Sequence, residues 1–179
     1  MDNDIYLTKH YRTYAPGEAI DCPLALFNDE VREEWIDYNG HMSESFYLYA
    51  MGEASDALFR YIGINEAYRA SGSSFYTVET HINYYQEVSK GEPLRFTTQV
   101  LGFDTKRLHF FHHMYHGNTG DLLATTEQML LHVDMNTSSA APIKPHVLAV
   151  LEQIWQAHRQ LPAPKQKGRV MAVPPTKKV

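Results

Sequence analysis

The chain has 179 residues, 44% of them hydrophobic, and a formal net charge of −5 at pH 7. This apolar content excludes an intrinsically disordered chain, and the length suits one domain with a sizeable core. The negative charge predicts no nucleic-acid partner and no binding to anionic membranes. No apolar run is long enough to span a bilayer, and the first residues lack the pattern of a signal peptide. The single cysteine excludes an internal disulfide and favours a cytoplasmic protein.

The first part of the chain is expected to run from an arm through a strand into a polar turn. Residues 1–21 are polar and are interrupted by proline and glycine, so we interpret them as a loose N-terminal arm. A single domain is expected to follow at 22–143. Within it, the stretch 24–35 is apolar and favours an extended first strand, which leads into the turn Asp37–His41.

The stretch 43–62 predicts one long helix. Its apolar residues recur at helical spacing and cover a wide arc. Ser43 is placed to cap the first turn, and Gly63 is placed to end the helix. So wide an apolar arc must be covered by a broad surface. Because strands follow in the sequence, we expect the helix to lie along a sheet.

A short helix at 65–70 and four strands are predicted next, the strands at 75–85, 94–103, 106–116 and 122–134. Short turns between them predict a four-stranded antiparallel meander, and thus an α+β fold. Alternation along 75–85 places Phe75, Glu79, His81 and Asn83 on one face and Tyr76, Val78, Thr80, Ile82 and Tyr84 on the other. The last part, 144–179, is expected to form a helix from Pro145 to Pro162 and then a tail along the surface.

The turn before the long helix is the best candidate for chemistry. It places the carboxylate of Asp37 and the imidazole of His41 beside the N-terminus of a helix, where backbone N–H groups stabilise negative charge. Acyl transfer needs a base or nucleophile beside donors that hold a developing oxyanion. On spacing alone, Asp37 and Asn39 are equally well explained as ordinary turn residues.

The order of elements and the segment IDYNGHM at 36–42 resemble the hot-dog fold of the 4-hydroxybenzoyl-CoA thioesterase type, an antiparallel sheet wrapped around one long central helix. This resemblance implies hydrolysis of an acyl-CoA thioester. It implies that Asp37 attacks the thioester carbonyl or activates water, while an N–H at a helix start polarises that carbonyl. We therefore predict Asp37, Gly40 and His41 as catalytic residues; His41 either orients the substrate or holds the turn. No metal or cofactor is expected, since coenzyme A is part of the substrate.

The resemblance also implies an assembly and a substrate. Hot-dog proteins pair their sheets, which implies a homodimer or a dimer of dimers with sites at the subunit interface. The segment EWIDYNGHM, the strand ETHINYYQEV and the later Gly168-Arg169 are similar to thioesterases of carnitine catabolism that act on betainyl-CoA. Aromatic residues near the turn fit a quaternary ammonium group, which cation–π attraction holds. The predicted substrate-binding residues are Trp35, Tyr38, Asn39, Tyr47 and Glu79, with Glu79 also an alternative base.

Two rival functions remain open from the sequence. One is a hydratase or dehydratase on the same fold, with His41 acting together with Glu53 or Glu79. The other is a non-catalytic acyl-CoA sensor. The four histidines at 109–116 have metal-ligand spacing only on a helix, and a strand would split them between two faces. Cys22 has no motif of a nucleophile and is expected to be a buried thiol.

Overall fold

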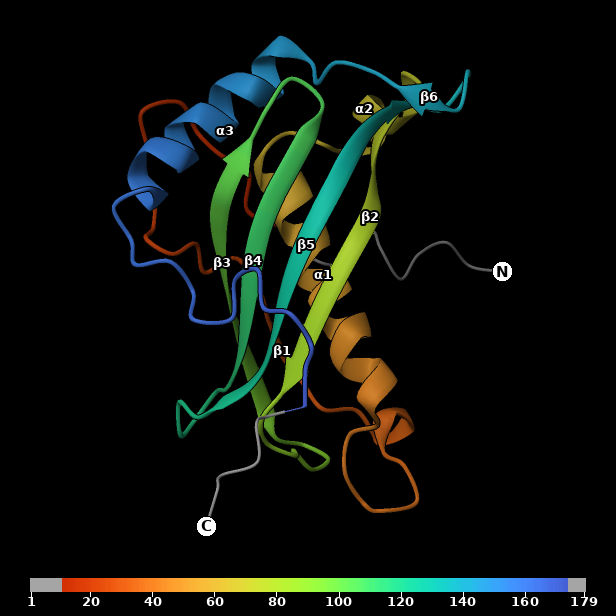
Figure 1. Cartoon of the computed structure of the whole chain (residues 1–179), viewed down its shortest axis with the longest axis vertical. Coiled ribbons are helices and arrows are strands. Elements are labelled where there is room, and N and C mark those ends of the chain that lie inside the picture. Colours follow the sequence, from red (N-terminus) through yellow and green to blue (C-terminus); the bar gives the residue numbers. More distant parts are fainter. Residues whose placement is uncertain (1–10, 174–179) are drawn as a thin grey trace.

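The computed structural model describes residues 11–173, and a six-stranded antiparallel sheet with the helix α1 along one face dominates it (Figure 1). None of the helices in this part of the chain is long and apolar enough to cross a membrane. The elements in chain order are β1 (Asn28–Glu30), the 3-10 helix η2 (Glu33–Trp35), α1 (Glu44–Tyr61), α2 (Glu66–Ala70), β2 (Ser73–Tyr84), β3 (Pro93–Phe103), β4 (Arg107–His116), β5 (Leu122–Asp134), β6 (Ser139–Ala140) and α3 (Pro145–His158).

The strand order is β1-β3-β4-β5-β2, with β6 paired to the end of β5. The prediction of a four-stranded meander is therefore wrong: only β3, β4 and β5 form one, while β2 pairs with β5. The physical reason is the segment 85–92, which is no tight turn but carries the chain from β2 at one edge of the sheet to β3, next to β1 at the other edge. On its way it passes the start of α1, where Met42 N donates to Val88 O at 2.8 Å.

A β-bulge interrupts β2. Thr77 pairs with Leu130 and Glu79 pairs with Met129, so β2 carries one extra residue at this point. Directly paired residues share a face, so Phe75 faces α1 with His132, and Tyr84 faces α1 with Ala124. The predicted alternation is therefore wrong across the bulge, because Phe75 and Glu79 lie on opposite faces.

The prediction of a long helix at 43–62 is confirmed by α1. Ser43 is its N-cap residue, although its side chain makes no capping hydrogen bond. Gly63 follows the C-terminus with a φ of +93°, a conformation that glycine adopts without strain. Several alanines lie on the buried side of α1, which lets the helix approach the sheet closely: Ala50, Ala54 and Ala57.

The N-terminal segment differs from its prediction. Residues 1–10 lie outside the described part, but residues 11–21 are not loose, because they pack on α1. Tyr14 N donates to Tyr61 O at 3.0 Å, and the two rings meet edge to face at 5.8 Å. Tyr61 Oη donates to Glu18 at 2.6 Å. The predicted first strand at 24–35 is shorter than expected, since only β1 and an isolated bridge at Leu24 are paired.

The segment after α3 crosses the face of the sheet opposite α1 (Figure 1). Gln99 Nε2 donates to Pro162 O at 3.3 Å, and Gly168 N donates to Glu127 Oε2 at 2.7 Å. The expected surface tail is thus held to the sheet over its described residues. The expectation for Cys22 was wrong, because its thiol is exposed.

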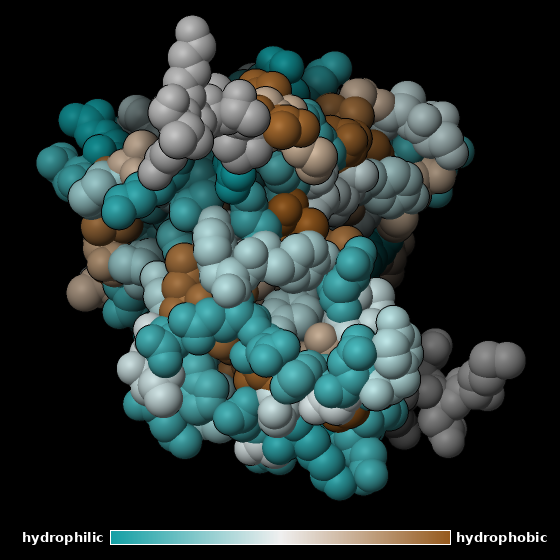
Figure 2. All heavy atoms as spheres, turned by 60° about the horizontal axis from the view of Figure 1, so that its bottom comes forward, coloured by the Kyte–Doolittle hydropathy of each residue, from teal (hydrophilic) through white to brown (hydrophobic). Residues whose placement is uncertain are grey.

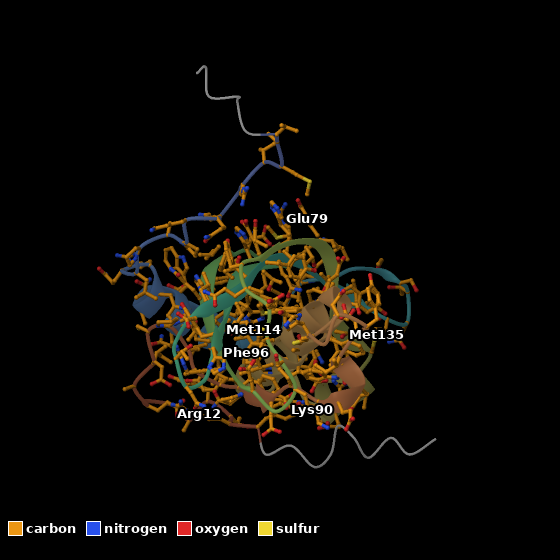
Figure 3. All side chains as sticks on the ribbon, turned by 90° about the horizontal axis from the view of Figure 1, so that it is seen from below. Arg12, Glu79, Lys90, Phe96, Met114 and Met135 are labelled. Atoms are coloured by element: carbon orange, nitrogen blue, oxygen red, sulfur yellow. The ribbon has the colours of Figure 1, made fainter. Side chains whose placement is uncertain are left out.

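The core between α1 and the sheet has two hydrophobic clusters. One surrounds Leu58 and α3, and the other surrounds Met51 and Phe96. Seen from below, Phe96 and Met114 lie centrally between the sheet and α1 (Figure 3). A group of polar residues, which we call the Ser55 cluster, connects α1 to four strands by hydrogen bonds: Ser55, Thr80, Thr98, His112 and Gln128.

Candidate active site

The turn between η2 and α1 is a closed loop held by its own backbone. Ile36 and Met42 form an antiparallel bridge. Asp37 N donates to His41 O at 2.9 Å, and Gly40 N donates to Asp37 O at 3.0 Å. Gly40 has a φ of +82°, which favours glycine at this position. The turn residues predicted from the sequence therefore give one fixed conformation.

The side chain of Asp37 is held within this turn. Its Oδ1 accepts a hydrogen bond from Asn39 N at 2.8 Å, an Asx-turn arrangement. Its Oδ2 accepts no hydrogen bond from the described residues 11–173. One carboxylate oxygen thus fixes the orientation of the group, and the other is available to a ligand.

Packing behind the turn fixes its place on the fold. Trp35 is 2% exposed and stacks on Phe46 of α1, with ring centroids 5.7 Å apart. The guanidinium of Arg32 lies 4.6 Å from the Trp35 ring centre. Ser43 N donates to Trp35 O at 2.8 Å. These contacts hold the start of α1 against the turn, so the carboxylate cannot shift relative to the helix.

A cavity of about 660 Å³ opens beside the turn. Its volume is within the range of about 300–1,000 Å³ usual for small-molecule sites. The turn and the start of α1 form one side, and the end of β2 with the segment after it forms the other. The lining residues are Asp37, Asn39, His41, Met42, Glu44, Tyr47, Tyr84, Tyr85, Gln86 and Glu87.

This cavity, which we call the active-site cavity, combines a carboxylate with the start of a helix, as acyl transfer requires. Glu44, the first residue of α1, lines the cavity, and N–H groups at the start of a helix lack intrahelical acceptors. Their partial positive charge stabilises an oxyanion. His41 Nδ1 lies 3.3 Å from Glu87 Oε2 across the cavity. In Figure 2 the molecule is turned so that the lower end of Figure 1 faces the reader, and the surface on this side is largely hydrophilic.

Two tyrosines in the lining remain neutral phenols. Burial, together with the nearby Glu87 carboxylate, raises the pKa of Tyr47 to about 12. Burial and the Glu44 carboxylate also raise the pKa of Tyr84. Neither side chain is therefore an anionic base near neutral pH.

The structure brings together four of the residues predicted from the sequence: Asp37, Asn39, His41 and Tyr47 all line the cavity. Gly40 shapes the turn, but its N–H donates to Asp37 O and is not a free oxyanion donor. Trp35 and Tyr38 do not line the cavity, because Trp35 is buried in the core and Tyr38 is 96% exposed.

Glu79 lies far from the turn. It stands on the face of the sheet opposite α1, next to the C-terminal segment (Figure 3). There it lines a separate, smaller hollow with His81 and Arg169. Glu53 is buried on α1 and also does not line the active-site cavity. A hydratase would need His41 paired with Glu53 or Glu79. Among the described residues, this cavity contains no such pair.

Six lining residues were not predicted from the sequence: Met42, Glu44, Tyr84, Tyr85, Gln86 and Glu87. The last four belong to the end of β2 and the segment after it, and they reach the turn because that segment passes the start of α1. The available signals were the run of polar and aromatic residues before Val88 and the similarity of the segment ETHINYYQEV that contains it.

A sheet curled along one long helix, with a carboxylate held in a turn at the helix start, defines a hot-dog thioesterase. Residues 31–151 match the Thioesterase-like superfamily, and the chain belongs to it. The predictions of a hot-dog fold and of a thioesterase are thereby confirmed.

Similar proteins agree with this assignment. The chain is 44% identical over 155 residues to the betainyl-CoA thioesterase of Pseudomonas aeruginosa, covering 86% of this chain and 98% of that protein. It is 43% identical over 157 residues to the L-carnitine dehydrogenase/betainyl-CoA thioesterase of Rhizobium meliloti, covering 87% of this chain but only 32% of that protein. A Staphylococcus aureus protein solved in complex with CoA is 25% identical, with a TM-score of 0.77 over 88% of this chain and 100% of that one.

Proposed function

We propose that this enzyme hydrolyses betainyl-CoA to free CoA and the betaine acid in carnitine degradation. The identity to the Pseudomonas aeruginosa betainyl-CoA thioesterase, over nearly all of that protein, supports the substrate. The observation that carries the chemistry is the carboxylate of Asp37, fixed by Asn39 N at 2.8 Å beside the start of α1.

Asp37 acts on the thioester carbonyl in one of two ways. As a nucleophile, its carboxylate bonds to the carbonyl carbon, CoA leaves as thiolate, and water then cleaves the resulting anhydride. As a general base, it takes a proton from a water molecule that attacks the same carbon. Both routes pass through an oxyanion, which the N–H groups at the start of α1 stabilise. The C–S bond breaks, and the thiolate takes up a proton.

This chemistry requires no metal or prosthetic group. A thioester is already activated toward acyl transfer, so an aligned carboxylate and oxyanion donors suffice. We also propose a cytoplasmic location, which the single cysteine supports, because it excludes an internal disulfide.

We further propose a homodimer that pairs through β2. Within residues 11–173 this strand is an edge of the sheet, so its outer backbone groups lack strand partners there. Tyr76 is 51% exposed and Val78 is 57% exposed along it. The active-site cavity lies at the end of the same strand, so a second copy paired here would close over it.

The test of the function is the release of free thiol from betainyl-CoA by the wild type and by Asp37→Asn. The asparagine retains an oxygen that accepts from Asn39 N, so the fold is expected to persist. Turnover should fall on the order of a hundredfold or more. Glu79→Gln is the matched control, since this carboxylate lies on the opposite face, and it should retain activity. Near-normal thiol release by folded Asp37→Asn would overturn the assignment of Asp37.

A further inference from the structure

The lining of the active-site cavity is rich in negative charge. Three carboxylates line it, those of Asp37, Glu44 and Glu87, and none of its described lining residues is lysine or arginine. His41 is the one basic side chain in this lining, and it lies against Glu87. Clustered carboxylates repel an anionic acyl group and attract a cationic one. The charge of the cavity therefore favours a positively charged acyl group.

The aromatic side chains in the cavity are arranged as two perpendicular walls. The rings of Tyr47 and Tyr84 have centroids 5.5 Å apart and planes at 89°. Their hydroxyl groups are both directed to backbone carbonyls: Tyr47 donates to Gln86 O at 3.1 Å, and Tyr84 donates to Glu44 O at 3.3 Å. The hydroxyls are thus occupied, which fixes the rings and leaves them to contact a ligand by their carbon surfaces.

These features match the needs of one kind of cation. A primary ammonium group has N–H donors that require acceptors, whereas a quaternary ammonium group has none. It is held by ring faces and by diffuse negative charge. Tyr47 is 4% exposed and Tyr84 is 44% exposed. The pair of rings therefore extends from the buried core at Tyr47 to the open part of the cavity at Tyr84. Glu44 and Glu87 supply negative charge from the two sides of the cavity.

We infer that Tyr47 and Tyr84, with Glu44 and Glu87 as counter-charges, form the subsite for a quaternary ammonium acyl group. This inference rests on the proposed function, and it corrects the aromatic cage predicted from the sequence. Trp35 and Tyr38 are not part of the subsite, because one is buried behind the turn and the other points to solvent. Tyr84 is the residue that sets specificity, while Asp37 performs the chemistry.

The test compares kcat/KM for betainyl-CoA and for 3,3-dimethylbutanoyl-CoA, in which a carbon atom replaces the nitrogen. The wild type should prefer betainyl-CoA by tenfold or more, on the order expected for cation–π contacts with two rings and added charge attraction. Tyr84→Leu should reduce this preference on the order of tenfold, whereas Tyr84→Phe, which keeps the ring, should retain most of it. Tyr115→Leu is the matched control. Tyr115 of β4 contacts Arg95 of β3 outside the cavity, so its loss should not change the preference.

A second variant covers the case in which Tyr84→Leu fails to fold. Glu87 is 73% exposed, so Glu87→Gln does not disturb the core, and it should lower the preference on the order of threefold. If the wild type cleaves both thioesters equally well, or if Tyr84→Leu and Glu87→Gln leave the preference unchanged, the subsite is wrong although the thioesterase assignment stands. If the wild type releases no thiol from betainyl-CoA, the proposed function itself fails.

Discussion

Ser55 of α1 and His112 of β4 are 57 positions apart in the chain, yet Ser55 Oγ and His112 Nε2 lie 3.0 Å apart in the core. His112 Nδ1 in turn lies 2.8 Å from Thr98 Oγ1 on β3, and Ser55 Oγ also donates to Gln128 Oε1 at 3.1 Å. Hydrogen bonds have strict geometry, so these contacts fix how far α1 slides along the sheet. The position of Asp37, at the other end of the same helix, depends on that register.

Ser55→Ala should therefore destabilise the protein. The change leaves buried polar atoms of His112 and Gln128 without a partner, which costs about 1–3 kcal/mol of unfolding free energy. Urea unfolding followed by circular dichroism measures the difference. Ser45→Ala is the control, because Ser45 is exposed on the same helix and should change little. Equal stability of the two variants would mean that the Ser55 cluster contributes nothing.

Stability should also depend on pH through His112. Burial lowers its pKa from 6.5 to about 3. Since the unfolded chain takes up this proton at higher pH than the folded chain, the stability from neutral His112 is fully present above about pH 6.5. It is lost as the pH falls toward 3. Between about pH 7.5 and about pH 5, His112 should account for about 2 kcal/mol of the loss.

The measurement is urea unfolding at these two pH values for the wild type and His112→Gln. The variant should lose less stability on acidification than the wild type, by that same amount. His146→Gln, at an exposed histidine of α3, should behave like the wild type. An identical pH dependence in wild type and His112→Gln would contradict the role given to burial.

Gly40→Ala tests the turn. A Cβ added at this position would have no atom within 4 Å, so a methyl group fits, and the cost comes from the φ of +82° alone. Alanine in this region costs about 1–2 kcal/mol. We expect lower activity with little change in overall fold, because the strain falls on the turn that orients Asp37. Gly40→Asn should retain more activity, since asparagine tolerates this conformation. Steady-state kinetics would decide, and equal activity of all three proteins would refute the argument.

Val78→Lys tests the proposed dimer. A lysine on the edge strand β2 opposes pairing with a second copy. In sedimentation experiments at micromolar concentration, the wild type should be a dimer and the variant should shift toward monomer and lose activity. Ala149→Lys, on the exposed side of α3, should leave the assembly unchanged. A monomeric wild type would rule out the dimer.

Local patterns predicted much of this fold, because local forces determine α1, the strand positions and the turn. Helical spacing, Gly63 and the polar run at 37–41 act within a few residues. The pairing of β2 with β5 is different, because it depends on where the segment 85–92 leads the chain. No local propensity encodes that path.

The same distinction between local sequence and chain topology separates the site residues that were predicted from those that were not. Asp37, Asn39 and His41 belong to a short motif and were found from it. Tyr84 and Glu87 reach the cavity only through the topology, so they were missed. Trp35 was expected at the substrate because it neighbours Asp37 in sequence, yet its size favours burial in the core.

The extra residue in β2 gives this strand a property that burial alone would not reveal. Ahead of Val78, odd-numbered positions such as Phe75 face the helix, and beyond it even-numbered ones such as Tyr84 do. Deleting Val78 would remove the bulge, and the residues beyond it would keep their partners on β5, so Tyr84 would still face the helix. A residue inserted or deleted between Thr80 and Tyr84 would instead shift the later positions by one and turn Tyr84 toward the opposite face. The bulge is thus the one place in this strand where a deletion leaves the later side chains on their faces.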